Sequence, residues 1–342
     1  MILLLLACRS PDPGLSIEDI TRVVQDDDDA RSWAIDVRDA LLEAKQPVDR
    51  DHVCQVLAII EQESGYEADP AVPGLAAAVE KEIDASLKKL GPLANVGKDT
   101  LLGPYADRLR EVKTERDVDL LFREIVAHHE ARAPALARLA RFIFPRLIER
   151  NNPIATAGSM QVSVAWAQDQ GNLDAETVRD LLYTQRGGVR YGTGRLFAHE
   201  AGYDRPVYRF ADYNAGLYAS RNAAFQVRLA DLVRVDLVPD GDLLMYDERG
   251  RPRSEDGETL RAILAWRLLH APDLSESRVR SDARKEKEAA FERTELWTRT
   301  RGDGPYAQVP DVALISPKMA AGRTTRWFAE RVDRRYRECL AR

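Results

Sequence analysis

Apolar residues recur at every third or fourth position along most of the chain, which is the spacing that places them on one face of an α-helix. The alternation of apolar and polar residues that is typical of half-buried strands is scarce. The pattern predicts helices over residues 16–25, 32–45, 50–64, 75–90, 105–113, 115–131, 134–149, 175–183, 188–201, 219–235 and 257–270. We therefore predict a mainly α protein.

Helix-start residues agree with this division. Ser16 is followed three positions later by Asp19, and Thr114 by Asp117, which is the spacing of an N-terminal capping box with Asp in place of the usual Glu. Further along, Arg and Glu crowd residues 276–293. That charge predicts an exposed extension rather than a catalytic module.

The composition is that of an ordinary globular protein. Of the 342 residues, 44 % are hydrophobic and 31 % are charged. The formal net charge of −6 argues against a dedicated nucleic-acid-binding protein, because neutralising phosphates requires a basic face. A chain of this length can form one large domain with elaborations, or two domains.

The first residues bear on where the protein resides. Residues 1–6 are almost wholly apolar, and residues 5–8, Leu-Leu-Ala-Cys, resemble the lipobox of bacterial lipoproteins, in which the chain is cut before the cysteine and the thiol is lipidated. A signal peptide normally also has a basic start and a longer apolar stretch, so we expect that the true start lies upstream or was misassigned. The resemblance implies that residues 1–8 are a signal remnant and that Cys8 carries a lipid that anchors the protein to a membrane. Such a protein lies in the bacterial cell envelope and faces the periplasm; Arg9 is not the aspartate that retains many lipoproteins in the inner membrane, which favours the outer membrane.

The two other cysteines, Cys54 and Cys339, leave two alternatives open. They could join an early helix to the C-terminal region as a disulfide, which an oxidising compartment would allow, or they could be two buried thiols. The five histidines are scattered, and only His128 and His129 adjoin, in a charged helix where solvent exposure is the simpler interpretation. We predict no metal site and no cofactor.

The first of three short motifs closes the helix predicted over residues 50–64. The buried face of this helix is marked by Val53, Val56, Leu57 and Ile60. Glu63 follows Ile60 by three positions, so its carboxyl group should lie at the edge of that face, where desolvation and the negative end of the helix dipole raise the pKa of an acid. A glycosidic oxygen needs such a proton donor in order to leave. Glu61 lies about 200 degrees around the helix and is expected in solvent. Taken alone, a glutamate at a helix end is also what a surface carboxylate would look like.

The second motif covers residues 157–162, Ala-Gly-Ser-Met-Gln-Val. Gly158 lets the backbone approach a ligand closely, and Gln161 offers both a donor and an acceptor without charge, which suits sugar hydroxyl and N-acetyl groups. Taken alone, the motif favours a loop whose Met160 fills the core.

The third motif covers residues 210–216, Phe-Ala-Asp-Tyr-Asn-Ala-Gly. Its small residues allow close packing, and Tyr213 and Asn214 supply neutral hydrogen-bonding groups. Taken alone, it is compatible with a helix end capped by Gly216.

Together and in this order, the motifs resemble the Glu-Ser, Gly-Leu-Met-Gln and Ala-Tyr-Asn-Ala-Gly motifs of the soluble-type lytic transglycosylases. The resemblance spans residues 61–216 and implies a lysozyme-like helical domain, of the goose-type lysozyme and transglycosylase kind, in a divergent lipoprotein branch of the family. It implies that Glu63 is the essential acid and base, and that Tyr213 hydrogen-bonds it. The residues that the resemblance assigns to binding or supporting the sugar site are Ser64, Gly158, Met160, Gln161, Tyr213 and Asn214.

The chain departs from the family pattern in three places. Ser159 replaces the usual leucine of the second motif, and Asp212 precedes the tyrosine of the third. Glu63 and Gln161 are 98 residues apart, where the family has a few tens at most. We therefore expect residues 74–150 to be a helical insertion that covers or extends the groove.

The domain organisation follows from the same comparison. We expect residues 9–250 to form the lysozyme-like domain and residues 251–342 to form a mostly helical C-terminal extension. Residues 187–194 occupy the place where the family has a helix lining the groove, although they contain more glycine than such a helix usually does.

The resemblance implies a cell-wall lyase acting on peptidoglycan glycan strands. Glu63 would protonate the oxygen that links N-acetylmuramic acid to N-acetylglucosamine and then accept the proton of the C6 hydroxyl as it attacks C1, which leaves a 1,6-anhydro end. A hydrolytic muramidase would need a second carboxylate, for which Asp69 and Asp212 are available. An envelope lipoprotein that binds peptidoglycan without cleaving it is the alternative from another class. The sequence does not identify a protein partner.

Overall fold

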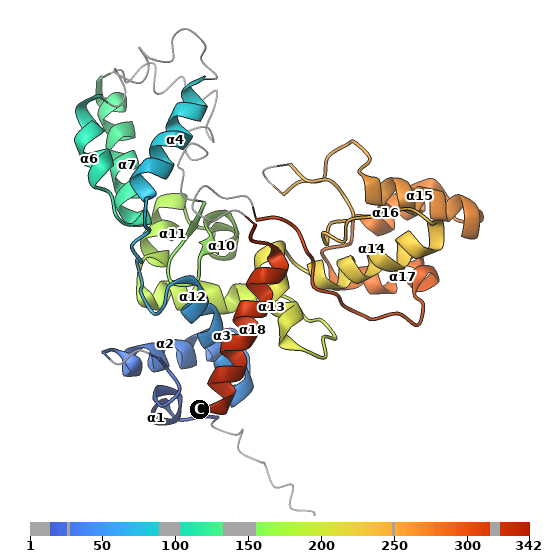
Figure 1. Ribbon diagram of the computed structural model, residues 1–342, viewed down its shortest axis with the longest axis horizontal. Helices are drawn as coiled ribbons and strands as arrows, with labels where there is room; N and C mark the ends of the chain where they lie inside the picture. Colours follow the sequence, from blue (N-terminus) through green and yellow to red (C-terminus); the bar gives the residue numbers. More distant parts are fainter. Residues whose placement is uncertain (1–13, 26–27, 89–102, 133–154, 248–249, 315–321) are drawn as a thin grey trace, which may run out of the picture.

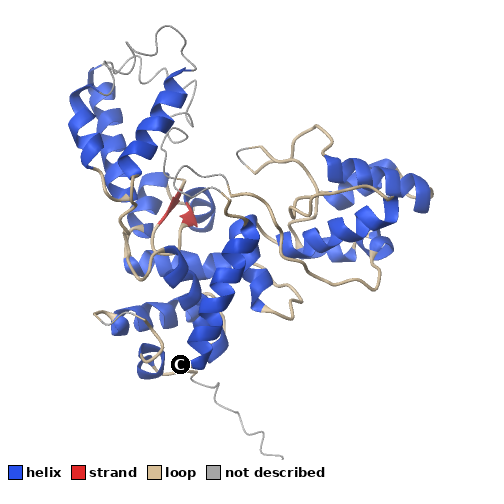
Figure 2. Ribbon diagram, viewed as in Figure 1, coloured by secondary structure: helices blue, strands red, loops and turns tan. Residues whose placement is uncertain are grey.

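The computed structural model describes residues 14–25, 28–88, 103–132, 155–247, 250–314 and 322–342. These residues are mainly helical, which confirms the prediction of a mainly α protein, and their strands form one two-stranded sheet (Figures 1 and 2). They divide into three parts, which we call the central lobe, the arm and the second lobe.

The central lobe combines segments from the start, the middle and the end of the chain. Its elements are α1 (Ile17–Thr21), α2 (Ala30–Glu43), α3 (Arg50–Glu63), β1 (Thr156–Ala157), β2 (Val162–Ser163), α10 (Val164–Gly171), α11 (Ala175–Leu182), α12 (Gln185–Leu196), α13 (Pro206–Ala215) and α18 (Thr325–Ala341). Helices α2, α12 and α18 all pack against α3 (Figure 1). Every residue from Val53 to Ile60 is buried, so α3 is the central helix of this core.

The arm projects from the central lobe and lies within the insertion predicted from the sequence (Figure 1). Its elements are α4 (Leu75–Lys88), η2 (Gly103–Tyr105), α6 (Ala106–Glu111) and α7 (Glu115–Arg132). At its root the backbone N–H of Val72 donates to the carbonyl of Lys113 (2.9 Å), and Ala71 pairs with Thr114 in an antiparallel bridge. This pairing closes the base of the arm beside the end of α3.

Both predicted capping boxes are confirmed. The Thr114 hydroxyl accepts from the backbone N–H of Asp117 (3.1 Å), and the Asp117 carboxylate accepts from that of Thr114 (2.9 Å), so α7 begins at Glu115. Ser16 and Asp19 make the same reciprocal bonds at the start of α1. The helix predicted over residues 134–149 lies outside the described residues.

The second lobe has a hydrophobic core of its own. Its elements are α14 (Ala219–Val233), α15 (Glu258–His270), α16 (Glu276–Ala283), η3 (Ala289–Arg293) and α17 (Glu295–Thr300). Phe225 of α14 belongs to this core, so the lobe begins well before the boundary expected near residue 250. The prediction that residues 276–293 are an exposed extension is wrong, because Val279, Ala283 and Phe291 are fully buried there.

The last helix returns to the central lobe, where α18 packs along α3 and α13. Cys54 of α3 and Cys339 of α18 form a disulfide, with their Cα atoms 5.6 Å apart. Glu61 forms ion pairs with Arg335 (3.2 Å) and Arg342 (3.6 Å). The expectation that Glu61 faces solvent is therefore wrong, because α18 covers that side of α3. Residues 251–342 are divided between the two lobes rather than forming one extension.

Candidate functional site

Glu63 is the last residue of α3 and lies half-buried at the end of this core helix. The helix stops because Ser64 caps it: the Ser64 hydroxyl and backbone N–H both donate to the carbonyl of Ile60 (3.0 Å each). Burial and, after it, the negative charge of Glu115 raise the pKa of the Glu63 carboxyl to about 8. Glu63 is therefore mostly protonated at neutral pH, which a general acid requires.

The second motif forms the turn of a hairpin made by β1 and β2, which we call the site hairpin (residues 156–163). Gly158 adopts φ +80°, and a Cβ there would lie 2.1 Å from the carbonyl oxygen of Leu182. Only glycine meets both demands, so Gly158 serves the close approach of two backbones. The two backbones are those of the site hairpin and of Leu182, whereas the sequence suggested that Gly158 lets the backbone approach a ligand.

The site hairpin packs directly on α12. Met160 is fully buried, as its core-filling interpretation expected, and a Cβ at Gly192 would lie 2.2 Å from the Met160 sulfur. A Cβ at Gly188 would likewise lie 2.7 Å from the hydroxyl oxygen of the buried Ser159. The extra glycines of α12 therefore leave room for the side chains of the site hairpin. The predicted helix is present despite them.

Gln161 joins the site hairpin to the arm. Its amide nitrogen donates to Glu115 (3.1 Å), and its amide oxygen accepts from the Thr156 hydroxyl (2.8 Å). The amide nitrogen also donates to the carbonyl of Gly158 (3.5 Å), so both ends of the side chain are used within the protein and only one lone pair of the amide oxygen is left over for a sugar.

Tyr213 of α13 is bonded to the site hairpin, and the charge of Glu63 acts on it. Its hydroxyl donates to the carbonyl of Met160 (2.7 Å), and burial and the neighbouring Glu63 hold the pKa of this phenol well above its usual range. Because the single O–H of Tyr213 is given to Met160, the phenol oxygen can only accept a bond from a protonated Glu63. Asn214, the next residue, is exposed.

Asp212 does not supply a second carboxylate for chemistry at Glu63. It is fully buried, and its oxygens accept from the hydroxyl of Tyr203 (2.6 Å) and the backbone N–H of Ser220 (2.7 Å). The ring nitrogen Nε2 of His199 lies 2.8 Å away from the same carboxylate. These bonds join α13 to the start of α14, so Asp212 is a structural residue.

The second carboxylate beside Glu63 is Glu115, the first residue of α7 in the arm. It is only 4 % exposed. Asp69, the other candidate from the sequence, is half-buried near Thr114 at the root of the arm, where burial raises the pKa of its carboxyl. The Thr114 capping box marks Glu115 as a helix start, but nothing in the sequence places it near Glu63.

Ion pairs hold the start of α7 on the central lobe. Arg123 of α7 bridges Asp119 of its own helix and Asp180 of α11 (3.0 Å). Arg179 of α11 lies 3.6 Å from the buried carboxylate of Asp119. Together with the backbone pairing at the root of the arm, these contacts fix Glu115 against the site.

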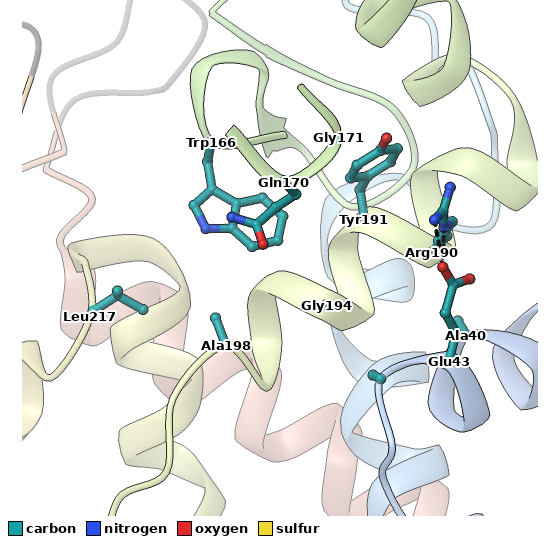
Figure 3. Close-up of a pocket in the computed structure, with 11 residues that line it drawn as sticks. Ala40, Glu43, Trp166, Gln170, Gly171, Arg190, Tyr191, Gly194, Ala198 and Leu217 are labelled. Atoms are coloured by element: carbon teal, nitrogen blue, oxygen red, sulfur yellow. Dashed lines mark hydrogen bonds and ion pairs between the residues drawn. The ribbon is translucent and has the colours of Figure 1, made fainter. Parts of the chain in front are cut away.

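A cavity of about 420 Å³ lies between α2, α10 and α12 (Figure 3). Trp166 and Gln170 of α10 stand on one side of it, and Arg190 of α12, which pairs with Glu43 of α2 (2.7 Å), stands on the other. Glu63 is not among the residues that line it. The cavity is therefore distinct from the cluster around the acid.

The predicted lipid anchor cannot be followed in the fold, because Cys8 and the rest of residues 1–8 lie outside the described residues. Among the helices that the structure describes, none combines the length and the apolar character needed to cross a bilayer.

Comparisons with known proteins place the chain in a family. It is similar to a protein of Escherichia coli (strain K12) with the name Uncharacterized protein YaiW. The two are 34 % identical over an alignment of 369 residues, which covers 99 % of this chain and 96 % of that protein. No solved structure matches it. A family model described as Protein of unknown function (DUF1615) matches residues 26–342. Since that match extends over most of the sequence, the chain belongs to the DUF1615 family.

Proposed function

We propose that this protein is a peptidoglycan lytic transglycosylase with Glu63 as its acid and base. The observation that carries the proposal is the raised pKa of Glu63, about 8, at the end of a core helix and beside Tyr213. A carboxyl group that stays protonated at neutral pH is what cleavage of a glycosidic bond needs and what a surface carboxylate lacks.

The fold supports the same proposal at a coarser level. A lysozyme-like domain would present its acid at the end of a buried helix, opposite a small sheet and close to a later helix. Here α3, the site hairpin and α13 bring the three motifs together, although Glu63 and Tyr213 are far apart in sequence.

In the proposed reaction, Glu63 gives its proton to the glycosidic oxygen as the bond from that oxygen to C1 of the muramic acid breaks. The resulting carboxylate of Glu63 then takes the proton of the C6 hydroxyl, while the oxygen of that hydroxyl bonds to C1. The product carries a 1,6-anhydro ring, and Glu63 is protonated again. Tyr213, held by the Met160 carbonyl, positions the acid through its phenol oxygen.

The location that we propose is the periplasmic side of the cell envelope, with Cys8 as the lipid anchor to the outer membrane. The disulfide between Cys54 and Cys339 supports an oxidising compartment, because structural disulfides are rare where thiols are kept reduced.

The test is to incubate the protein without residues 1–8 with purified peptidoglycan sacculi and to identify the released muropeptides by mass spectrometry. We expect anhydro-muropeptides, and we expect Glu63→Gln to abolish them. Glu67→Gln is the matched control, because Glu67 is an exposed carboxylate four positions along the chain. Release that persists in Glu63→Gln would rule out its role as the acid.

Hydrolysis is the second candidate, and the presence of Glu115 beside Glu63 favours it, since a hydrolase needs two carboxylates. The same experiment separates the two reactions, because hydrolysis leaves reducing ends in place of anhydro ends. Binding of both proteins to sacculi without any release would instead support a module that binds peptidoglycan without cleaving it.

A further inference from the structure

The cavity between α2, α10 and α12 presents aromatic and polar side chains together. Trp166 and Gln170 lie four positions apart on α10, so they share one face of that helix and stand on the same side of the cavity (Figure 3). Arg190 and Tyr191 of α12 line it from the other side. Its volume of about 420 Å³ lies within the range of about 300–1,000 Å³ that is usual for small-molecule sites. The cavity is therefore large enough to hold a small ligand.

The surrounding structure holds the two aromatic rings in place. Trp166 is half-buried against the core of the central lobe, and the guanidinium of Arg195 lies over its ring, 5.9 Å from the centroid. Tyr191 is only 7 % exposed, and the guanidinium of Arg190 lies over its ring at 5.3 Å. Rings that are fixed before a ligand arrives lose little conformational entropy when it binds.

A glycine leaves the space beside Trp166 open. Gly194 lines the cavity, and among the described residues a Cβ at this position would meet only the Trp166 ring, at 3.6 Å. The absent side chains of Gly188 and Gly192 make room for the site hairpin, whereas that of Gly194 makes room in the cavity. The indole ring therefore stays accessible from the cavity.

The lining of the cavity carries no net charge. Its charged side chains are Glu43 and Arg190, which pair with each other (2.7 Å). A phosphate or an ammonium group would therefore meet no unpaired opposite charge in this lining, and its desolvation would be unfavourable. Gln170 supplies an amide donor and acceptor, and Trp166 supplies an apolar face. This combination favours an uncharged ligand that has several hydroxyl groups and one apolar face, which is the chemistry of a neutral sugar ring.

We propose that the cavity is an accessory binding site for a neutral N-acetylhexosamine unit of the glycan strand, stacked on Trp166. The C–H groups on one face of a pyranose ring are attracted to the negative face of an indole, and the Gln170 amide bonds hydroxyl or N-acetyl groups. The uncharged lining favours N-acetylglucosamine over N-acetylmuramic acid, which carries a lactyl carboxyl group or the peptide attached to it. The identification of the ligand as a peptidoglycan sugar rests on the proposed function, whereas binding of a neutral sugar can be measured without any cleavage.

The site would act on long strands in particular. Because Glu63 does not line the cavity, a sugar unit in the cavity leaves the acid free for another unit. Once one unit of a strand is bound, binding of a second unit is intramolecular, which raises the affinity for the strand as a whole.

The test is to titrate the Glu63→Gln protein, in which no cleavage should disturb the measurement, with the tetramer of β-1,4-linked N-acetylglucosamine. Calorimetry measures the affinity, and NMR of protein labelled with ¹⁵N follows the indole N–H of Trp166, which Trp166→Phe assigns. The same titration is made with Trp166→Ala and with Gly194→Leu, whose side chain fills the cavity on a residue that favours helix. Trp327→Ala is the matched control, because Trp327 is also half-buried and has the guanidinium of Arg323 over its ring, at 4.5 Å.

We expect the tetramer to shift the Trp166 signal and to bind about tenfold more weakly to Trp166→Ala and Gly194→Leu. Trp327→Ala should bind it as tightly as the parent protein. Muramyl dipeptide, a negatively charged probe, should shift the Trp166 signal only at higher concentration than the tetramer does.

A Trp166 signal that no concentration of the tetramer shifts would overturn the inference. So would an unchanged response of that signal in folded Gly194→Leu, or a tighter response to muramyl dipeptide than to the tetramer. If the wild type releases no muropeptides from sacculi, the proposed function fails, and the titration still decides whether the cavity binds a neutral sugar.

Discussion

The protonated state of Glu63 affects stability as well as chemistry. Its pKa is about 8 in the folded protein against an ordinary value of 4.5, so the folded state holds a proton that the unfolded chain has released between these values. The stabilisation from this group is therefore complete below about pH 4.5 and is lost as the pH rises through about 8. Glu63→Gln keeps the shape of the side chain and does not titrate. We expect the variant to gain stability over wild type by on the order of a few kcal/mol as the pH increases over this range. Urea unfolding at a series of pH values measures the gain, and parallel curves for the two proteins would contradict it.

At the scale of single residues, the sequence predicted the position of Glu63 better than its surroundings. The periodicity of α3 was enough to place Glu63 at the edge of a buried face, because that placement depends only on local geometry. Gln161 was identified by type, but the sequence could not show that both ends of its amide bond to the protein. Glu115 was missed, because its position beside Glu63 depends on how the arm returns to the lobe. Asp212 was named with Asp69 only as an available second carboxylate, and the sequence could not show that its partners lie on other elements.

At the scale of elements, the glycines of α12 pack closely against the side chains of the site hairpin. Gly192→Ala should drive a methyl group into the Met160 side chain, since a Cβ there would lie 2.2 Å from the sulfur. We expect a loss of about 1–3 kcal/mol in the free energy of unfolding. Because Met160 also holds Tyr213, we expect activity to fall as well. Urea unfolding measures the first effect and muropeptide release the second.

The control lies on the same helix. A Cβ at Gly194 meets only the Trp166 ring, at 3.6 Å, which is ordinary contact. Gly194→Ala should therefore be neutral or stabilising by up to about 1 kcal/mol, because alanine favours helix over glycine. Equal effects of the two substitutions on the free energy of unfolding would mean that the packing of Gly192 on Met160 does not contribute to stability.

The elements that the sequence missed were short or heavily charged. The strands of the site hairpin have two residues each, too few for an alternating pattern to be recognised. Residues 325–341 were not among the helices predicted from periodicity, yet α18 buries Phe328, Val332, Tyr336 and Cys339, spaced by three or four positions. That apolar stripe was visible in the sequence, so periodicity should have been given more weight there than charge density.

At the scale of the whole molecule, the chain leaves the central lobe, forms a second core and returns. Local patterns predicted a mainly helical protein, but they contain no information on which helices share a core. The return of α18 to α3 is fixed by contacts between residues far apart in sequence, including Glu61 with Arg335 and Arg342. The cysteine count allowed the covalent link, and only the fold brings the two sulfurs together.

The disulfide between Cys54 and Cys339 closes this long excursion, because the two residues are 285 positions apart. In the chain-entropy description, a link across so long a loop stabilises the folded state by on the order of 5 kcal/mol, although strain and residual structure reduce the measured gain. We expect a reducing agent to lower the melting temperature of the wild type and to leave that of the Cys54→Ala/Cys339→Ala variant unchanged. Ion pairs and packing also hold α18 on α3, and Glu63 lies at the opposite end of α3 from Cys54. We therefore expect the reduced protein to keep its activity at temperatures well below its melting temperature. A wild-type melting temperature that does not respond to reduction would mean that these non-covalent contacts alone determine the stability of the returning helix.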